Sequence, residues 1–250
     1  MHRRLEPVRT GESGALVWKC VGIGPLWYLK AAPVAGGLRL DHEAARLRWM
    51  HARQLFAPAV VRYVNTGGSE YLLTEEAAGE PAFEQKWISR PADVAIALGR
   101  CLSKLHSVNT VECPFDRRIS VQLDEARLRI ANGDVREDDF DAIRQGRTAT
   151  DIFAELLTMV PESEDLVFVH GDFSLPNILL SAEDSGAVNV TGLIDCGRAG
   201  IGDRHQDIAL AIRSLTYNFD TAAVAPFLAT YGRPVDARTT EFFTILDEFF

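Results

Sequence analysis

Three short apolar runs enclose a cluster of polar residues in the third quarter of the chain. The runs cover residues 166–169, 178–180 and 188–194. Apolar runs of this length, bounded by turn residues, are typical of buried strands. Between the first two runs lies the segment His170-Gly171-Asp172-Phe173-Ser174-Leu175-Pro176-Asn177, and Asp195 follows the third run. The segment thus contains an aspartate, Asp172, and an asparagine five positions later, Asn177. The strand pattern predicts that the second aspartate, Asp195, lies on a different strand.

These residue types at this spacing favour phosphoryl transfer, because protein kinases place a catalytic aspartate, a metal-binding asparagine and a metal-binding aspartate in this order. A hydroxyl that attacks a phosphoryl group needs a carboxylate to orient it and to take its proton. Hard oxygen ligands hold magnesium against the phosphates. We therefore expect Asp172 to be catalytic, and Asn177 and Asp195 to bind Mg²⁺. The alternative is structural: Asp172 begins a turn, Asn177 caps a strand and Asp195 pairs with Arg198.

Composition is that of a globular protein. The 250 residues are 47% hydrophobic and 24% charged, which predicts a packed core. No apolar run approaches the ~20 residues that span a bilayer, and the first residues lack a secretory signal, so we expect a cytoplasmic protein without membrane contact. The four cysteines are scattered, which predicts packing roles rather than a disulfide framework or a zinc site.

Charge is unevenly distributed along the chain. Residues 1–119 contain 16 Lys and Arg against 12 Asp and Glu, whereas residues 120–250 contain 10 against 23. The basic first part suits a nucleoside triphosphate, and the acidic second part repels nucleic acid and attracts cations. The asymmetry indicates a cationic second substrate. The alternative is an acidic surface that serves only solubility.

The first third of the sequence predicts β-hairpins around one helix. Strand patterns cover residues 15–19, 26–31, 61–65 and 71–75, and the helix between them has Leu47, Met50 and Leu55 at roughly helical spacing. Helical patterns dominate later, in a helix with Pro91 in its first turn and in residues 207–215 and 239–249. We expect an α+β chain with two closely packed lobes, residues 1–78 and 79–250.

The usual phosphate-binding motifs are missing, since neither a P-loop nor a Rossmann fingerprint occurs. The segment Gly11-Glu12-Ser13-Gly14 instead predicts a tight turn whose backbone N–H groups and Ser13 hydroxyl approach phosphate oxygens. Lys30 ends an apolar strand, and Glu43 at the start of the next helix is its nearest suitable partner. Kinases fix a phosphate-binding lysine in this way. A surface salt bridge without function is the alternative.

Four segments in order resemble the aminoglycoside 3′-phosphotransferases, bacterial antibiotic-resistance kinases related in fold to protein kinases. They are His170-Gly171-Asp172-x-x-x-x-Asn177, Ile194-Asp195-Cys196-Gly197-Arg198-Ala199-Gly200, Asp207-Ile208-Ala209 and Leu246-Asp247-Glu248-Phe249-Phe250. The resemblance runs from about Thr10 to the last residue. It implies a protein-kinase-like, two-lobed fold, in which an antiparallel β-sheet lobe with a helix binds the nucleotide and a larger, mainly helical lobe binds the drug.

The resemblance also implies roles on the nucleotide side. Lys30 and Glu43 would form the ion pair that holds the phosphates of ATP or GTP, and Ser13 would touch the triphosphate. Tyr28 would stack on the adenine, and backbone groups of Glu75 and Ala77 would meet its edge. Asp172 would be the catalytic aspartate, with Asn177 and Asp195 as magnesium ligands.

On the acceptor side, the resemblance implies a small polycationic aminoglycoside bound by a monomer or weak dimer. Arg198 and Arg213 would support the site and the drug pocket. The acidic candidates are Asp138, Asp141, Asp247, Glu248 and the carboxylate of Phe250. Five acids lie within residues 134–141, which fits a flap over the drug or, alternatively, a solvated loop.

One departure from the family pattern affects the expected drug spectrum. Tyr217-Asn218 stands where some members have an adjacent acidic pair. Two other functions remain open at this point. One is a kinase for another cationic or sugar-like metabolite, such as choline or a fructosamine, and the other is a non-catalytic binding protein of the same fold.

Overall fold

A computed structural model describes residues 4–8, 15–34 and 37–250, so the whole predicted glycine turn, Ser13 included, lies outside the described residues. The chain divides into two compact units. The first consists of Met1–Glu84 and Pro176–Arg198, and the second of Gln85–Leu175 and Ala199–Phe250. Asn177 and Asp195 therefore belong to the first unit, and Asp172 to the second.

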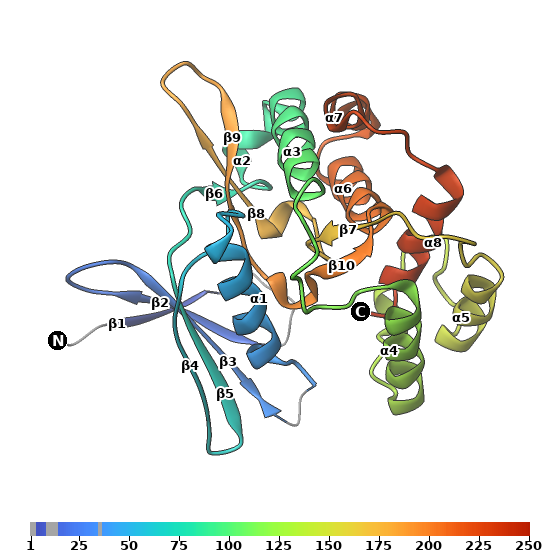
Figure 1. Ribbon diagram of the computed structural model, residues 1–250, viewed down its shortest axis with the longest axis horizontal. Helices are drawn as coiled ribbons and strands as arrows, with labels where there is room; N and C mark the ends of the chain where they lie inside the picture. The colour runs from blue at the N-terminus through green and yellow to red at the C-terminus, as the bar shows by residue number, and fades with distance from the viewer. Residues whose placement is uncertain (1–3, 9–14, 35–36) are drawn as a thin grey trace. The chain divides into compact units, whose positions relative to one another are not determined.

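A five-stranded antiparallel sheet forms the larger part of the first unit (Figure 1). Its strands are β1 (Arg4–Val8), β2 (Leu16–Val21), β3 (Trp27–Pro33), β4 (Val60–Thr66) and β5 (Ser69–Glu75), in the order β1-β2-β3-β5-β4. Helix α1 (Leu40–Ala52) packs on β4 and β5. The predicted hairpins are thus present, and Gly67 and Gly68, both with positive φ, make the β4–β5 turn.

A second, three-stranded sheet completes this unit, in the order β6-β8-β9. It contains β6 (Glu80–Pro81), β8 (Ile178–Ala182) and β9 (Val188–Leu193). Gly79 precedes β6 with a φ of +109°, and a Cβ on it would lie 2.8 Å from the carbonyl oxygen of Leu180 and 2.4 Å from Oγ1 of Thr191. Only glycine fits where β6 leads into this sheet.

The second unit is mainly helical. Two short strands, β7 (Leu166–Val169) and β10 (Gly200–Asp203), pair antiparallel within it. Its helices are α2 (Gln85–Ile88), α3 (Pro91–Leu105), α4 (Ile119–Asn132), α5 (Ala149–Leu157), α6 (His205–Asn218), α7 (Val224–Tyr231) and α8 (Ala237–Asp247). Single 3₁₀ turns occur at Glu137–Asp139, Leu175–Asn177, Cys196–Arg198 and Thr221–Ala223.

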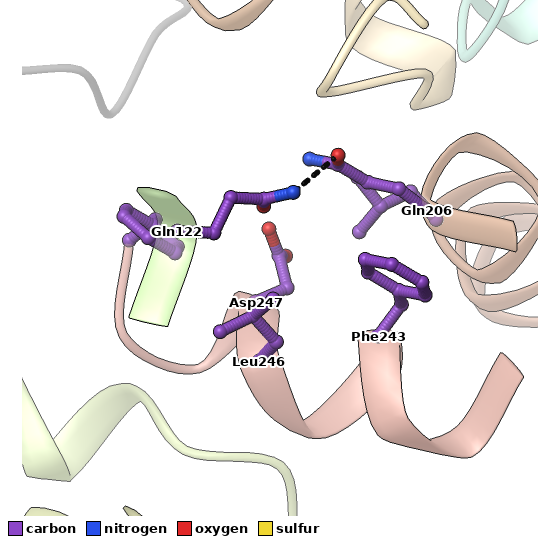
Figure 2. A pocket seen from close by; sticks show the side chains of 7 residues that line it. Gln122, Gln206, Phe243, Leu246 and Asp247 are labelled. Carbon is purple, nitrogen blue, oxygen red and sulfur yellow. Dashed lines mark hydrogen bonds between the residues drawn. The ribbon is translucent and has the colours of Figure 1, made fainter. Parts of the chain in front are cut away.

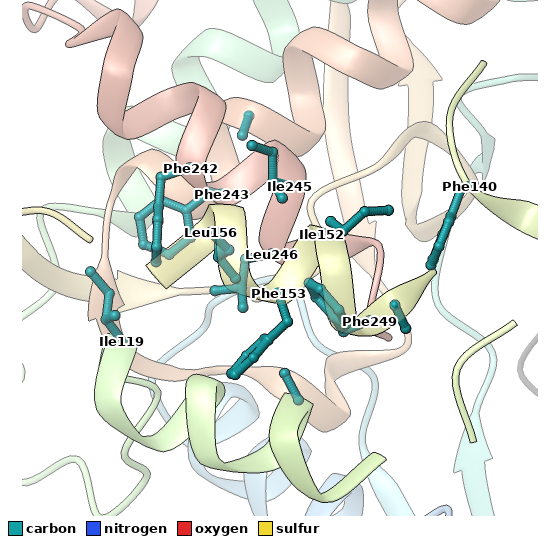
Figure 3. Packing of buried hydrophobic residues seen from close by; sticks show 13 residues of the cluster. Ile119, Phe140, Ile152, Phe153, Leu156, Phe242, Phe243, Ile245, Leu246 and Phe249 are labelled. Carbon is teal, nitrogen blue, oxygen red and sulfur yellow. The ribbon is translucent and has the colours of Figure 1, made fainter. Parts of the chain in front are cut away.

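A hydrophobic core fixes the end of α8 (Figure 3). Apolar side chains from α4, α5 and α8 meet there, among them Phe153, Phe242 and Leu246, and the Phe153 and Phe249 rings pack edge to face at 5.6 Å. Complete burial of each large apolar side chain contributes about 1.5–3 kcal/mol. The residues between Leu246 and Phe249, which include Asp247 and Glu248, are therefore held on a rigid base.

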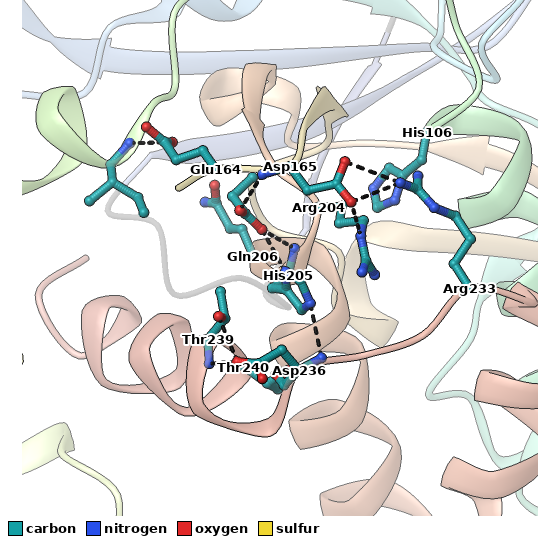
Figure 4. A network of polar contacts seen from close by, with 12 residues as sticks. His106, Glu164, Asp165, Arg204, His205, Gln206, Arg233, Asp236, Thr239 and Thr240 are labelled. Atoms are coloured by element: carbon teal, nitrogen blue, oxygen red, sulfur yellow. Dashed lines mark hydrogen bonds and ion pairs between the residues drawn. The ribbon is translucent and has the colours of Figure 1, made fainter. Parts of the chain in front are cut away.

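A buried polar network fixes the start of α6 (Figure 4). Asp203 binds Nδ1 of His205 at 2.7 Å, and the backbone N–H of Asp236 donates to Nε2 of the same ring at 3.1 Å. Since Nε2 accepts, the ring proton is on Nδ1, where it donates to the carboxylate. Arg204 pairs with Asp165 at 2.7 Å. By fixing the start of α6, this network also fixes the next two residues of the helix, Gln206 and Asp207.

The predicted elements differ from the structure mainly at their ends. The helix expected at residues 239–249 is α8, which ends at Asp247, and Leu55 is buried although it lies beyond the end of α1. No helix among the described residues is long and apolar enough to cross a bilayer. Of the four cysteines, which are all free thiols, Cys20, Cys101 and Cys196 are buried. The lobe boundary expected between residues 78 and 79 stays a prediction.

Candidate active site

Lys30 lies at the centre of a buried charge cluster in the first unit. Its Nζ is 3.0 Å from Oε2 of Glu43 on α1, and it also binds Oδ1 of Asp195. Burial alone would lower the pKa of Lys30, but the two carboxylates raise it above its usual value. Burial raises the pKa of Glu43, and Lys30 opposes that shift. The ion pair expected from the sequence is thus present, and Asp195 joins it.

Strand pairing brings the two expected magnesium ligands to the same end of the β8–β9 hairpin. Ile178 pairs with Leu193, and the backbone N–H of Ile194 donates to the carbonyl of Asn177 at 3.0 Å. Asp195, the next residue, has a φ of +57°, which is uncommon for a residue with a side chain. This backbone bend follows the end of β9 at Leu193, and the Asp195 carboxylate forms an ion pair with Lys30.

The chemistry of this pair fits Mg²⁺. An amide oxygen from Asn177 and a carboxylate from Asp195 are hard donors, and magnesium usually takes one or two protein oxygens and completes its shell with phosphates and water. Within residues 4–8, 15–34 and 37–250 no three His, Cys, Asp or Glu side chains gather into a metal-binding group. A magnesium ion held mainly by a nucleotide needs no such group.

Tyr28 lies on the same face of β3 as Lys30, because side chains two residues apart in a strand point the same way. Lys19 on β2 is its cross-strand neighbour, with Nζ 5.6 Å from the centre of the Tyr28 ring. Lys19 also pairs with Glu76 at 2.7 Å. This pair raises the pKa of Lys19. Tyr28 and Lys30 therefore offer a ring and a cation along one face.

Two backbone N–H groups at the end of β5 donate hydrogen bonds within the first unit. The N–H of Glu75 donates to the carbonyl of Ala59 at 2.9 Å, and the N–H of Glu76 donates to the carbonyl of Leu26 at 2.9 Å. The N–H of Glu75 is therefore already engaged within the first unit. Ala77 follows at the start of the connection to β6.

Asp172 lies in a compact turn of the second unit, directly after β7. Its Oδ1 accepts a hydrogen bond from the Ser174 hydroxyl at 3.1 Å, and its backbone N–H donates to Nδ1 of His170 at 3.2 Å. Gly171 has a φ of +84°, a conformation that glycine adopts without strain. Asp172 is half-buried.

Helix α6 holds this turn by its backbone. Asp207 is completely buried, and its carboxylate accepts the N–H groups of His170 at 2.7 Å and Gly171 at 2.9 Å. Gln206 donates to the carbonyl of Gly171 at 3.0 Å, and His106 contacts the Asp207 carboxylate at 3.2 Å. The sequence drew attention to Asp207 as part of a motif, but gave no role to it, to Gln206 or to His106.

A small pocket lies beside this anchor in the second unit (Figure 2). Asp247 and Phe250 line it together with Gln206, and Gln122 donates to Gln206 at 3.0 Å across it. The other lining residues are Leu210, Phe243 and Leu246. The cavity volume is about 10 Å³, roughly the space that one water molecule needs. Gln206 thus connects the pocket wall to the residue before Asp172.

The expected drug-contact residues of the second unit fall into two groups. Asp247 forms an ion pair with Arg213, and the Phe250 ring lies 5.7 Å from the Arg117 guanidinium. Burial lowers the pKa of Arg213, but Asp247 more than compensates. These residues lie on or beside the pocket. Arg198 belongs to the first unit, in the turn that follows Asp195.

Glu248 and Asp141 form the other group. The Glu248 side chain is only 3% exposed, and its oxygens accept the backbone N–H of Asp141 at 3.1 and 3.3 Å and bind Arg144 at 3.2 Å. Burial and the nearby Asp141 raise the pKa of Glu248 to about 7. Asp138 is exposed, and its carbonyl accepts from Gln145. The acidic segment is therefore attached to the C-terminal residues through Asp141.

Comparison with known proteins decides the family. The model of the phosphotransferase enzyme family matches residues 22–242. An aminoglycoside 3′-phosphotransferase from Streptomyces fradiae is 38% identical over 260 residues, which cover 100% of this chain and 96% of that protein. The chain belongs to the aminoglycoside 3′-phosphotransferase family. The resemblance seen in the four sequence segments is confirmed.

Solved structures confirm the fold of this phosphotransferase. A crystal structure of an aminoglycoside 3′-phosphotransferase of type VIII has a TM-score of 0.89 and 35% identity, covering 98% of this chain and 94% of that one. A complex of the phosphotransferase APH(3′′)-Id from Streptomyces rimosus with ADP and streptomycin has a TM-score of 0.82 and 26% identity, covering 98% and 92%. The expected α+β, protein-kinase-like fold and the assignment as a kinase are both confirmed.

Proposed function

We propose that this phosphotransferase transfers the γ-phosphoryl group of magnesium-bound ATP or GTP to the 3′-hydroxyl of aminoglycosides such as kanamycin and neomycin, and so confers resistance to them. The relatives that cover nearly the whole chain carry this activity in their names. One structural observation supports the proposal above all. Gln206 lines a pocket together with Asp247 and the C-terminal residue, and it also donates to the carbonyl of Gly171 beside Asp172.

Asp172 is the proposed catalytic residue. Its carboxylate orients the acceptor hydroxyl and takes its proton as the phosphoryl group is transferred. Ser174 donates to Oδ1 of this carboxylate, and we propose that the other oxygen faces the acceptor hydroxyl. Asp207 and Gln206 prevent the turn from moving away, which preserves the alignment on which phosphoryl transfer depends.

Lys30, fixed by Glu43, is proposed to hold the nucleotide phosphates, with Tyr28 stacked on the base and the backbone of Glu75 and Ala77 at its edge. Ser13 would contact the triphosphate. Asn177 and Asp195 are proposed to hold Mg²⁺, which when bound neutralises charge on the phosphates. The Lys30 and Asp195 contact supports this assignment, because it places the Asp195 carboxylate beside the cation that would hold the phosphates.

The acceptor side is proposed to recognise ammonium groups. Asp247 and Phe250 would contact the drug, with Arg198 and Arg213 as supports. Asp138, Asp141 and Glu248 would add negative charge nearby. We also propose a cytoplasmic enzyme, which has access to nucleoside triphosphates there, as a monomer or weak dimer with lobes 1–78 and 79–250.

The proposal is tested by incubating the protein with Mg²⁺, ATP and kanamycin and measuring the drug by mass spectrometry. A mass increase of one phosphate is expected, and product NMR should assign it to the 3′ position. Phosphorylation of choline or a fructosamine without any aminoglycoside product would favour the metabolite kinase instead. Tight kanamycin binding without a product would favour a non-catalytic binding protein.

A further inference from the structure

Arg144 is the most deeply buried arginine within residues 120–250, the acidic part of the chain. It follows the 3₁₀ turn Glu137–Asp139 and precedes α5, and its side chain is 4% exposed. Its guanidinium meets three carboxylates: Glu241 at 2.6 Å, Glu248 at 3.2 Å and Asp141 at 3.6 Å. A charge so deeply buried is tolerated only when partners of opposite charge surround it.

The three carboxylates connect separate parts of the second unit. Glu241 lies within α8, and Glu248 lies directly after it. Asp141 belongs to the acidic segment, and its backbone N–H donates to Glu248 at 3.1 Å. Arg144 thereby fastens the acidic segment to the end of α8, one residue beyond Asp247.

The exposures of these side chains differ in a consistent way. The Asp141 carboxylate is 40% exposed, whereas Arg144 and Glu248 are 4% and 3% exposed. An approaching polycation therefore meets the carboxylate of Asp141 and not the arginine behind it. The arginine neutralises the repulsion that would otherwise push Asp141 and Glu248 apart.

We propose that Arg144 is a positioning residue for the aminoglycoside, which by holding Glu248 fixes the carboxylate of Asp141 and the end of α8 that carries Asp247. The inference rests on the proposed function and identifies what sets the shape of its acceptor side. Arg144 acts through its partners and does not touch the drug.

The catalytic turn has a separate anchor. Asp172 is held through Gly171 by Asp207 and Gln206, whereas Arg144 forms ion pairs with Asp141, Glu241 and Glu248. Loss of Arg144 should therefore weaken drug binding while the chemistry of bound drug continues. This separation distinguishes a positioning role from general damage to the fold.

The test compares Arg144→Met with Arg144→Lys and with Arg147→Met as a control. Arg147 lies three residues away and forms an ion pair with Glu155 of α5 at 2.5 Å, with side chains that are 38% and 42% exposed. We expect Arg144→Met to raise the KM for kanamycin about tenfold, as for a lost charge contact, with kcat and the KM for ATP nearly unchanged. Arg144→Lys should restore part of the loss, and Arg147→Met should match the unaltered protein.

A double-mutant cycle with Glu248→Gln examines the route of the effect. If Arg144 acts through Glu248, the double variant should have a KM close to that of the worse single variant, since coupled residues are not additive. The inference is overturned if the KM increases of the two single variants multiply in the double variant. It is also overturned if Arg144→Met leaves the KM unchanged, or if kcat falls only in proportion to the loss of folded protein. Should Arg144→Met not fold, Arg144→Lys and Glu241→Gln are measured instead and must raise the KM for kanamycin.

Kanamycin binding by calorimetry, without ATP, separates this inference from the proposed function. If the unaltered protein gives no phosphorylated kanamycin, the proposed function fails. The inference survives that result only if Arg144→Met still weakens binding about tenfold relative to Arg147→Met. Equal dissociation constants for these two variants overturn it.

Discussion

The Asp207 carboxylate accepts the backbone N–H of Gly171 at 2.9 Å, one residue before Asp172. The same carboxylate accepts the N–H of His170 and is completely buried. A side chain on α6 therefore fixes the backbone of the catalytic turn, and the position of Asp172 depends on a residue 35 positions further along the chain.

Asp207→Asn tests this dependence. The new amide group would bring an N–H donor against backbone N–H groups, leaving a buried donor without a partner, which costs about 1–3 kcal/mol. We expect a lower unfolding temperature and a lower kcat. Asp220→Asn, at the exposed start of the 3₁₀ turn Thr221–Ala223, is the control and should change neither. Full activity in Asp207→Asn would show that the turn keeps its conformation without the Asp207 carboxylate.

Asp172→Asn addresses catalysis itself. The amide keeps the shape of the side chain but cannot take a proton, so kcat should fall by about 10²–10⁴-fold. Nucleotide binding, measured by calorimetry with ADP, should stay within about twofold, because no charge on the nucleotide side is altered. Residual turnover above a tenth of the original would argue against Asp172 as the base.

Variants of Lys30 and Glu43 can separate an effect on the free energy of unfolding from an effect on enzyme activity. Lys30→Met leaves Glu43 buried without its partner, and breaking a buried pair in this way costs about 3–5 kcal/mol. Adding Glu43→Gln should recover much of this stability in chemical denaturation, because the unpaired charge is gone. Activity should not recover, since the phosphate-binding cation is still missing. A double variant as active as the original protein would remove Lys30 from the mechanism.

Glu248 predicts how stability depends on pH. Its pKa is about 7 in the folded protein against the usual value of 4.5 for a glutamate, so the folded state binds its proton more tightly. The resulting stabilisation is fully present below pH 4.5 and is lost as the pH rises through 7. Glu248→Gln does not titrate, so its unfolding free energy should fall less between pH 5 and pH 8, a window of about this width. Parallel stability curves for the two proteins would contradict the shift.

Gly79→Ala should destabilise the first unit, because its Cβ would approach the Leu180 carbonyl oxygen at 2.8 Å while the backbone keeps a φ of +109°. We expect a loss of a few kcal/mol, about 2–4, from strain and displaced backbone together. Gly67→Ala is a matched control, since Gly67 also has positive φ but open space around it. Its loss should be about 1 kcal/mol. Equal melting temperatures would mean that β8 adjusts freely.

Local patterns were sufficient to predict the strands around the catalytic segment and the Lys30–Glu43 pair. Apolar runs determine where a strand is buried, and a lysine at a strand end needs a nearby acid. They could not predict the partners of Glu248. A glutamate near the chain end is typical of solvent exposure, and its burial depends on Arg144, 104 residues earlier. The role of Gln206 escaped prediction for the same reason, because no local spacing links it to Gly171.

The division of the chain has a consequence for biosynthesis. The five strands β1–β5 are complete once residue 75 has left the ribosome, but the sheet that contains β6 needs β8 and β9, which end at Leu193. Domains tend to fold as units during synthesis, starting from the N-terminus. In this chain the first unit stays open until more than three quarters of the protein has been translated. Asn177 and Asp195, which flank β8 and β9, thus join the first unit long after its five-stranded sheet has been synthesised.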